Sequence, residues 1–278
     1  MSRSQSELTP QSTDNSKELP HGFIQGEVLT IKHWSSKVFS LTVAVDEFHF
    51  TAGQFTKLGL LNHEGKVIRR AYSMVNAPQI SGPQLLEFLI IRIDDGLLSP
   101  PLHQLQSGDA IYVGQTATGF MTLDELPEKV DHLWLLSTGT AIGPFLSLIE
   151  SILSGAPFAG ESINLVHAVR TKAELVYQER ILKWVHQSPI PIHYMPIVSR
   201  EPITPHEAPY PILDGRIPAR LADGSLAKAA GITLTPDSFF YICGNPAMVK
   251  DTAAQLSELG YSKHLRRKPG QFSSENYW

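Results

Sequence analysis

The residues with the clearest chemical potential stand in one short segment, Arg70-Ala71-Tyr72-Ser73. An arginine guanidinium can hold a diphosphate through two parallel hydrogen bonds. On a β-strand, Tyr72 points to the same side as Arg70, and its ring can stack on a flat aromatic ligand. Ser73 adds a hydroxyl that can pair with a ring nitrogen. The alternative interpretation is an ordinary strand whose arginine is satisfied by a neighbour.

A second segment, residues 137–144, combines glycines, threonines and a proline directly after a short apolar run. Its glycines let backbone N–H groups approach a ligand, and the helix N-terminus that follows favours an anion. Pro144 suits the first turn of that helix. The segment lacks both the Gly-Lys-Ser/Thr of a Walker loop and the spacing GxGxxG. A tight structural turn and a pyrophosphate cradle therefore both stay open.

The chain ends on two large aromatic side chains, Tyr277 and Trp278, with no charged tail after them. Each buries roughly 150–250 Å² when it docks against a protein or ligand surface. One interpretation is a terminus packed onto the protein core. The other is a lid over a flat aromatic cofactor.

Composition places the chain among soluble globular proteins, with 42% hydrophobic and 18% charged residues and a net charge of −4. That charge gives no general attraction to nucleic acid or to an anionic membrane. The single cysteine, Cys243, excludes an internal disulfide and a cysteine-ligated iron–sulfur cluster within the chain. No residues show metal-ligand spacing. Without a signal- or transit-peptide pattern, we expect a cytoplasmic protein with a disordered tail over residues 1–21.

The first half of the chain alternates in the manner of β-strands. Strands are expected at residues 24–31, 38–43, 54–60, 71–75, 85–92 and 110–113, and a short helix at 99–105. Turn signals such as Asp94-Asp95-Gly96 separate them. Six short strands with this punctuation predict an antiparallel Greek-key β-barrel over residues 22–126.

The second half alternates apolar strand-like runs with helical patterns. Strands are expected at residues 133–136, 163–166, 192–198 and 239–242, and helices at 145–153, at 173–184 and up to about 259. This repeat predicts βαβ units and a parallel sheet, hence an α/β nucleotide-binding domain over residues 127–278. The boundary is placed near residue 126, within the segment 124–131.

These motifs occur in the order found in ferredoxin–NADP(+) reductases. The segments are Arg-Ala-Tyr-Ser at 70–73, Thr-Gly-Thr-Ala-Ile-Gly-Pro at 138–144, Cys-Gly-Asn-Pro-Ala-Met-Val at 243–249 and the aromatic terminus. Residues 52–60 and 264–270, together with the final Tyr277-Trp278, resemble the bacterial flavodoxin/ferredoxin–NADP(+) reductase branch. The resemblance covers residues 23–278, and four collinear motifs are far more specific than any one of them.

The resemblance implies FAD on the barrel and NADP(H) on the α/β domain. Tyr72 would lie against one face of the flavin and Tyr277 against the other, with Trp278 near the adenine. Trp278 extends one residue beyond the terminal tyrosine of plant-type relatives. The FAD contacts implied in this way are Arg70, Ala71, Tyr72, Ser73, Leu89, Ile90, Ile91, Leu97, Leu98, Ser99, Thr140, Tyr277 and Trp278.

Three arginines, Arg170, Arg200 and Arg216, follow strands or loops of the second half. Each by itself is typical of a solvated surface charge. Together they suit the 2′-phosphate of NADP, because arginine near the ribose accommodates that group in nucleotide-binding folds. No acidic residue takes the place of Ser199-Arg200, which argues against NAD. The implied NADP contacts are Val169, Arg170, Ser199, Arg200, Arg216, Asn245, Pro246, Ala247 and Asp251.

Ser73, Cys243, Glu275 and Tyr277 match the hydride-transfer residues of the family. The flavin carries the chemistry, and the protein aligns nicotinamide C4 with flavin N5. By this resemblance, Ser73 bonds near N5, Cys243 and Glu275 position the nicotinamide, and Tyr277 moves away before hydride passes. Without the resemblance, Cys243 is equally consistent with an ordinary buried thiol.

A basic run, Lys263, Arg266, Arg267 and Lys268, stands beside the tail of an otherwise acidic chain. It is either a solvated face or the docking site of an acidic one-electron carrier, ferredoxin or flavodoxin. We predict a monomeric FAD enzyme that exchanges the hydride equivalents of NADPH for single electrons. The alternatives are an NADPH-dependent free-flavin or quinone reductase and a flavin redox sensor without turnover.

Overall fold

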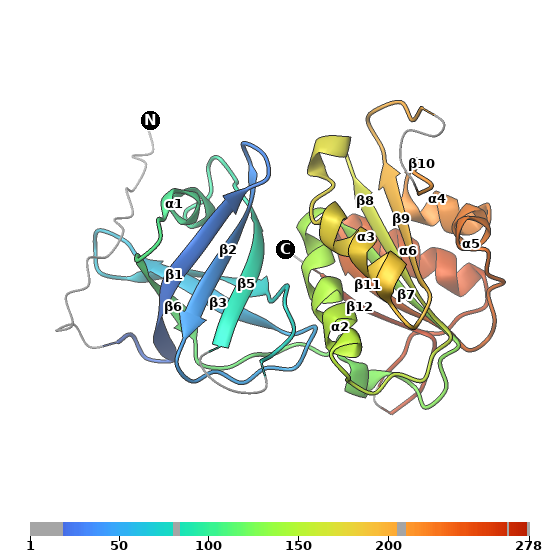
Figure 1. The fold of residues 1–278 in the computed structure, drawn as a ribbon, viewed down its shortest axis with the longest axis horizontal. Coiled ribbons are helices and arrows are strands. Elements are labelled where there is room, and N and C mark those ends of the chain that lie inside the picture. The colour runs from blue at the N-terminus through green and yellow to red at the C-terminus, as the bar shows by residue number, and fades with distance from the viewer. Residues whose placement is uncertain (1–18, 80–83, 205–209, 266, 277–278) are drawn as a thin grey trace. The chain divides into compact units, whose positions relative to one another are not determined.

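The computed structural model describes residues 19–79, 84–204, 210–265 and 267–276. The chain forms two compact units that divide between Phe120 and Met121 (Figure 1). The segment 124–131 lies within the second unit, where the Tyr241 hydroxyl donates a hydrogen bond of 2.6 Å to the Thr122 carbonyl oxygen. The boundary between the FAD and NADP domains near residue 126 stays a prediction.

The first unit is a six-stranded antiparallel sheet in the order β4-β3-β6-β1-β2-β5. Met74, directly after β4, bridges to Phe88 on β5, so the two edges of the sheet meet and close a barrel. Apolar residues of alternating strand positions fill its interior, as predicted from their period of two. Its elements are β1 (Phe23–His33), β2 (Val38–Val45), β3 (Phe55–Leu61), β4 (Val67–Ser73), β5 (Gln84–Ile91), α1 (Ser99–Gln104) and β6 (Ala110–Gly114).

Strand β4 begins at Val67, whereas the sequence predicted a start at residue 71. Two adjacent arginines, Arg69 and Arg70, interrupt the apolar alternation there, so the alternation does not predict the first residues of the strand. The β3–β4 turn fixes this early start, because the Asn62 side-chain oxygen accepts hydrogen bonds from the backbone N–H groups of Glu64 and Lys66, at 3.1 and 2.8 Å. Arg70 therefore lies inside a paired strand.

The second unit contains a six-stranded parallel sheet in the order β10-β9-β8-β7-β11-β12. Its strands are β7 (His132–Thr138), β8 (Ser162–Val169), β9 (Ile192–Val198), β10 (Leu213–Asp214), β11 (Ser238–Gly244) and β12 (Phe272–Asn276). Its α-helices are α2 (Gly143–Leu153), α3 (Gln178–Gln187), α4 (Ile217–Ala222), α5 (Ser225–Ala230) and α6 (Pro246–Glu258). Short 3₁₀ helices are η1 (Leu123–Glu125), η2 (Gly139–Ile142) and η3 (Lys172–Glu174).

Helices cover this sheet. Residues of α4, α5 and α6 pack against one face through a cluster that includes Trp134, Phe240 and Phe272. Figure 1 shows α2 and α3 in front of the same sheet. Strands such as β8 and β11 are buried along their whole length, as expected for a parallel sheet covered by helices.

Several predictions of elements in the second unit were wrong or incomplete. The helix expected from residue 173 begins at Gln178, because Tyr177 before it adopts a left-handed backbone with φ of +59°. A 3₁₀ turn, η3, occupies the start of the predicted helix. Strands β10 and β12 and helices α4 and α5 were not predicted from the sequence.

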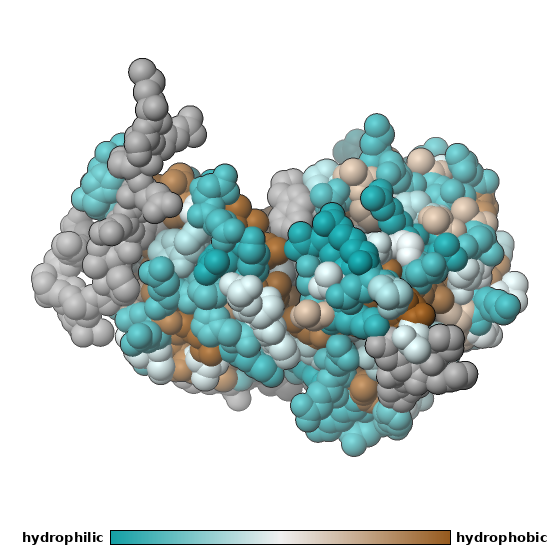
Figure 2. Space-filling view, turned by 90° about the horizontal axis from the view of Figure 1, so that it is seen from above, coloured by the Kyte–Doolittle hydropathy of each residue, from teal (hydrophilic) through white to brown (hydrophobic). Residues whose placement is uncertain are grey.

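Hydrophilic residues occupy much of the visible face in Figure 2, with hydrophobic residues in smaller groups between them. Among residues that the structure describes, no helix is both long enough and apolar enough to cross a lipid bilayer.

Candidate active site

The end of β4 presents the first predicted site residues. Arg70 pairs with Leu58 and Tyr72 with Thr56 on β3, so the strand alternation directs both side chains to one side. Tyr72 packs against the barrel core, and burial raises its pKa to about 12, a shift that the positive charge of Arg70 opposes. The phenol is therefore neutral at physiological pH. Ser73 is buried directly after it.

Arg70 is exposed and carries a charge that no carboxylate neutralises in the part of the chain that the structure describes. Within the described parts of the chain, its Nη1 donates a hydrogen bond to the carbonyl oxygen of Arg69, at 2.8 Å, and to no other residue. By contrast, Arg92 and Arg180 each form an ion pair. A guanidinium with unused donors on an exposed strand is able to bind a diphosphate.

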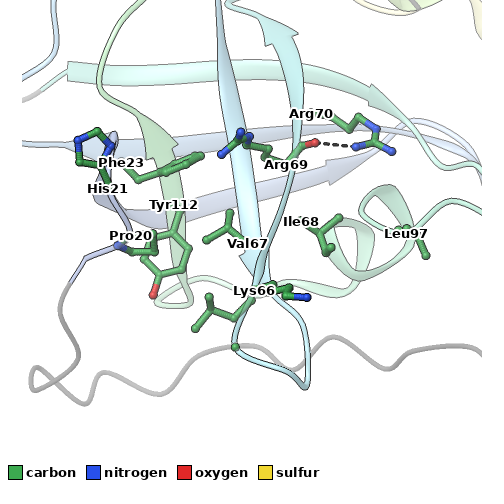
Figure 3. A pocket seen from close by; sticks show the side chains of 12 residues that line it. Pro20, His21, Phe23, Lys66, Val67, Ile68, Arg69, Arg70, Leu97 and Tyr112 are labelled. Carbon is green, nitrogen blue, oxygen red and sulfur yellow. Dashed lines mark hydrogen bonds between the residues drawn. The ribbon is translucent and has the colours of Figure 1, made fainter.

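A pocket of about 910 Å³ lies beside β4. In Figure 3, Arg70 extends to the side of the strand on which Leu97 lies, and Arg69 points toward Phe23 on the other side. The Arg69 guanidinium lies 5.9 Å from the centre of the Phe23 ring. Because Lys66, Arg69 and Arg70 all line this pocket, it favours a ligand that carries negative charge.

The other predicted FAD residues of the barrel lie on β5 and at the start of α1. Ile90 belongs to the barrel core, so Leu89 and Ile91 point to the opposite side of β5. Leu97 is 53% exposed, whereas Leu98 and Ser99 are buried. Of these residues, Leu97 lines the same pocket as the arginines and adds an exposed apolar side chain to it.

Two prolines limit the backbone donors at the start of α1. Pro100 and Pro101 occupy its first turn and have no N–H group. The hydroxyl of Ser99 accepts a hydrogen bond from the Ile93 backbone N–H at 2.9 Å, which shapes the preceding loop. Any N–H group that this helix start offers to a diphosphate must therefore come from a residue other than these two prolines.

The parallel sheet has a topological switch point between β7 and β11. From β7 the chain proceeds outward through β8, β9 and β10 on one side, and β11 and β12 lie on the other. In such sheets, ligands bind outside the carboxyl ends of the strands at the point where the order reverses. The carboxyl ends here are Thr138-Gly139 on β7 and Gly244-Asn245 on β11. These are two of the predicted motifs.

The ends of β7 and β11 are joined closely. The Thr138 hydroxyl oxygen accepts a hydrogen bond from the Asn245 backbone N–H at 3.0 Å. Gly244 has φ of +143°, and a Cβ at this position would lie 2.0 Å from that same oxygen. The side-chain oxygen of Asn245 caps α6 by accepting from Ala247 and Met248, at 3.0 and 3.4 Å.

A buried histidine holds the glycine turn after β7. The Nε2–H of His167, on β8, donates to the Gly139 carbonyl oxygen at 3.0 Å, and Gly139 has φ of +57°. Burial lowers the pKa of His167 to about 4, so the ring is neutral, and Nδ1 is a buried acceptor for which none of the described residues supplies a hydrogen bond. Thr140 is buried in the turn. His167 was not predicted as a site residue, although it stands three residues before Arg170, which was.

Cys243 and Glu275 are brought together by the sheet. In the register, Cys243 on β11 lies between Ser137 on β7 and Glu275 on β12. Burial of the Cys243 thiol raises its pKa well above the usual value, and the nearby Glu275 carboxylate adds to this shift. Cys243 is therefore a protonated thiol. Ser73 belongs to the other unit, and Tyr277 and Trp278 lie outside the described residues.

The three predicted arginines follow the carboxyl ends of adjacent strands β8, β9 and β10. The loops are joined, because the Arg200 backbone N–H donates to the Arg170 carbonyl oxygen at 2.9 Å. The Ser199 hydroxyl likewise donates to the Val169 carbonyl oxygen at 3.1 Å. Arg170 forms an ion pair with Glu174, whereas Arg200 and Arg216 form none with the residues described. A cationic site thus lies at the edge of the sheet.

The remaining predicted residues lie on the surface of the second unit. Pro246, Ala247 and Asp251 are exposed on α6. Lys263, Arg267 and Lys268 are exposed in the connection between α6 and β12, and Arg266 lies outside the described residues. That connection is folded back on itself, since Leu265 and Lys268 form a β-bridge.

Family models match both units. Residues 29–119 match the oxidoreductase FAD-binding domain, and residues 135–254 match the oxidoreductase NAD-binding domain. With the closed barrel, the parallel sheet and the cationic carboxyl edge, this defines a two-domain flavin- and nicotinamide-dependent oxidoreductase.

Proteins named flavodoxin/ferredoxin–NADP reductase are similar to nearly the whole chain. Those from Buchnera aphidicola and Escherichia coli K12 are each 40% identical, over 260 and 258 residues, which covers 92% of this chain and 99% of each relative. The chain belongs to the flavodoxin/ferredoxin–NADP reductase family. A solved ferredoxin NADP+ reductase from Neisseria gonorrhoeae is 33% identical with a TM-score of 0.82, over 93% of this chain and 100% of that one. The predictions of family, fold class and oxidoreductase activity are confirmed.

Proposed function

We propose that this chain is an FAD-dependent reductase that transfers electrons between NADP(H) and flavodoxin or ferredoxin. The observation that carries this proposal is the 40% identity, over 92% of the chain, to reductases of that name. The related structure from N. gonorrhoeae, 33% identical, was solved with FAD and NADP bound. When bound, FAD supplies the link between hydride transfer from a nicotinamide and single-electron transfer to a carrier.

The barrel residues fit FAD. Arg70 would hold the diphosphate, because its guanidinium has no carboxylate partner among the described residues. Tyr72 would stack on the flavin as a neutral phenol, which burial favours. Ser73 would offer its hydroxyl to the ring. On the other face, the roles of Tyr277 and Trp278 rest on the sequence resemblance.

The other FAD contacts would shape the cofactor site. The exposed Leu97 and the side chains of β5 that face away from the core supply apolar surface. Thr140 lies in the glycine turn that His167 fixes. The set proposed for this role is Ala71, Leu89, Ile90, Ile91, Leu97, Leu98, Ser99 and Thr140.

The carboxyl edge of the parallel sheet would bind NADP(H). Arg170, Arg200 and Arg216 would contact the 2′-phosphate, which is supported by their place after three adjacent strands. Val169 and Ser199 would provide the wall between them. The start of α6, with Asn245, Pro246, Ala247 and Asp251, would flank the rest of the nucleotide.

Cys243 and Glu275 would position the nicotinamide for hydride transfer. Their register across β11 and β12 brings them to the same level of the sheet, at the switch point. Cys243 is protonated, so it presents a small neutral surface rather than a thiolate nucleophile. Ser73 and Tyr277 complete the proposed catalytic set.

The acceptor is tested by comparing rates of NADPH oxidation by the FAD-loaded protein with flavodoxin, ferredoxin, free FMN or a quinone. We expect turnover to be fastest, at equal micromolar concentrations, with flavodoxin or ferredoxin. Turnover with free FMN or the quinone but with neither protein carrier would contradict the proposal and favour a small-molecule reductase.

A further inference from the structure

The side chain of Glu174 contacts both the backbone N–H and the guanidinium of Arg170. Its Oε1 accepts a hydrogen bond from Arg170 Nε at 2.9 Å and lies 2.9 Å from Nη2 in an ion pair. Its Oε2 accepts from the backbone N–H of Arg170 at 3.1 Å. One carboxylate therefore fixes both the main chain and the guanidinium of the same arginine.

These contacts leave some N–H donors of the Arg170 guanidinium available to a ligand. Arginine has five N–H donors in one plane, and Glu174 accepts a hydrogen bond from the one on Nε while its Oε1 also forms the ion pair with Nη2. The Arg170 side chain is 50% exposed, whereas that of Glu174 is 20% exposed. The carboxylate thus lies beneath the arginine, and the unused donors of Nη1 and Nη2 are available to a ligand in solvent.

The loop itself is held by other contacts. The Lys172 backbone N–H donates to the Glu201 carboxylate at 2.8 Å, and the Arg200 backbone N–H donates to the Arg170 carbonyl oxygen at 2.9 Å. These bonds tie the segment after β8 to the segment after β9. Among described residues, however, only Glu174 forms an ion pair with the Arg170 side chain. Loss of Glu174 would therefore release the guanidinium more than the loop.

We propose that Glu174 is a positioning residue that orders Arg170 for the 2′-phosphate and so contributes to the preference for NADPH over NADH. This inference rests on the proposed function of the arginine cluster. Two effects oppose each other, because a carboxylate also repels a phosphate. At an exposed site the repulsion is screened by water and salt, whereas fixing a long arginine side chain carries a large entropic cost. Ordering therefore outweighs repulsion.

The test is a double-mutant cycle on the FAD-loaded protein, with KM for NADPH and for NADH as readouts. Glu174→Ala should raise KM for NADPH about three- to ten-fold and change KM for NADH less than about two-fold. Glu174→Gln retains one carbonyl acceptor and should lie between wild type and the alanine variant. In an Arg170→Ala background, Glu174→Ala should have no further effect, because the side chain that it orders is gone.

Glu150→Gln is the matched control. It removes another ion pair of the second unit, between Glu150 and Arg180 at 2.8 Å, and should leave the ratio of the two KM values unchanged. The inference is overturned if Glu174→Ala lowers KM for NADPH, raises both KM values equally, or keeps its effect without Arg170. If the wild type itself does not prefer NADPH, the proposed function fails as well. If the wild type prefers NADPH and Glu174→Ala has the same two KM values as the wild type, only the inference about Glu174 fails.

Discussion

His167 shows how one buried side chain links the glycine turn to the pH dependence of folding. Its pKa is lowered to about 4 in the folded protein, against an ordinary value of 6.5. Between these values the unfolded chain binds a proton that the folded chain does not, so stability falls as pH falls from 6.5 to about 4. We expect this group to remove about 2 kcal/mol of unfolding free energy between about pH 6.5 and 4.5, measured by urea denaturation with FAD in excess.

His167→Gln is the control for this pH dependence. Glutamine retains an N–H donor for the Gly139 carbonyl oxygen but does not titrate. The variant should show a shallower loss of stability over the same pH range. An equal loss in both proteins would assign the effect to other groups, such as His103 and His193, whose pKa values burial also lowers.

The sequence predicts candidate site residues where they stand in motifs, and it does not reveal residues whose role depends on a partner far along the chain. The common orientation of Arg70 and Tyr72 was predictable, because residues two positions apart on a strand face the same side. His167 was not, because its role depends on a carbonyl oxygen that lies 28 positions away in the sequence. Glu174 was hidden in a segment expected to be helical.

Because the ends of β7 and β11 are joined, we expect substitution of the glycine between them to be unusually destabilising. At Gly244 an alanine Cβ would lie 2.0 Å from the Thr138 hydroxyl oxygen, at φ of +143°. Because strain and a clash add together, Gly244→Ala should lower the free energy of unfolding by at least about 2 kcal/mol, or about 5 °C in Tm. Thermal unfolding followed by circular dichroism measures this change.

Gly155 provides the matched comparison. It also has a positive φ, +104°, but no atom lies within 4 Å of a Cβ built there. Gly155→Ala should therefore cost only the backbone strain, about 1 kcal/mol. Equal shifts in Tm for the two variants would show that the contact with Thr138 does not constrain the switch point.

Strands were predictable where apolar alternation continued and were missed where it stopped. The second unit's central strands β7 and β11 carry continuous apolar runs, at residues 133–136 and 239–243. The polar segment of β12, Phe272–Asn276, has no such pattern and becomes a strand by pairing with β11. Its tertiary partner, not its own propensity, decides its conformation.

At the scale of the whole protein, the exposed basic run predicts that the rate of carrier reduction depends strongly on salt concentration. Lys263, Arg267 and Lys268 have no ion-pair partner in the part of the chain described. Attraction of an acidic flavodoxin or ferredoxin should weaken as the screening length shrinks. We expect the rate of carrier reduction at low carrier concentration to fall about ten-fold between about 0.02 and 0.3 M salt.

Two double variants assign this effect to a surface. Arg267→Gln with Lys268→Gln should flatten the salt dependence. Lys183→Gln with Lys228→Gln changes the net charge equally at other exposed positions of the second unit and should not flatten it. A steep slope retained by the first pair of substitutions would move the docking site elsewhere.

The most direct measurement is an anaerobic titration of the FAD-loaded protein with NADPH, followed by oxidised flavodoxin. We predict that NADPH bleaches the flavin absorbance at stoichiometric amounts, that NADH at the same concentration does so far less, and that flavodoxin restores the absorbance. A protein that takes up no FAD, or a bound flavin that keeps its colour with NADPH, would contradict electron transfer from NADP(H) through this chain.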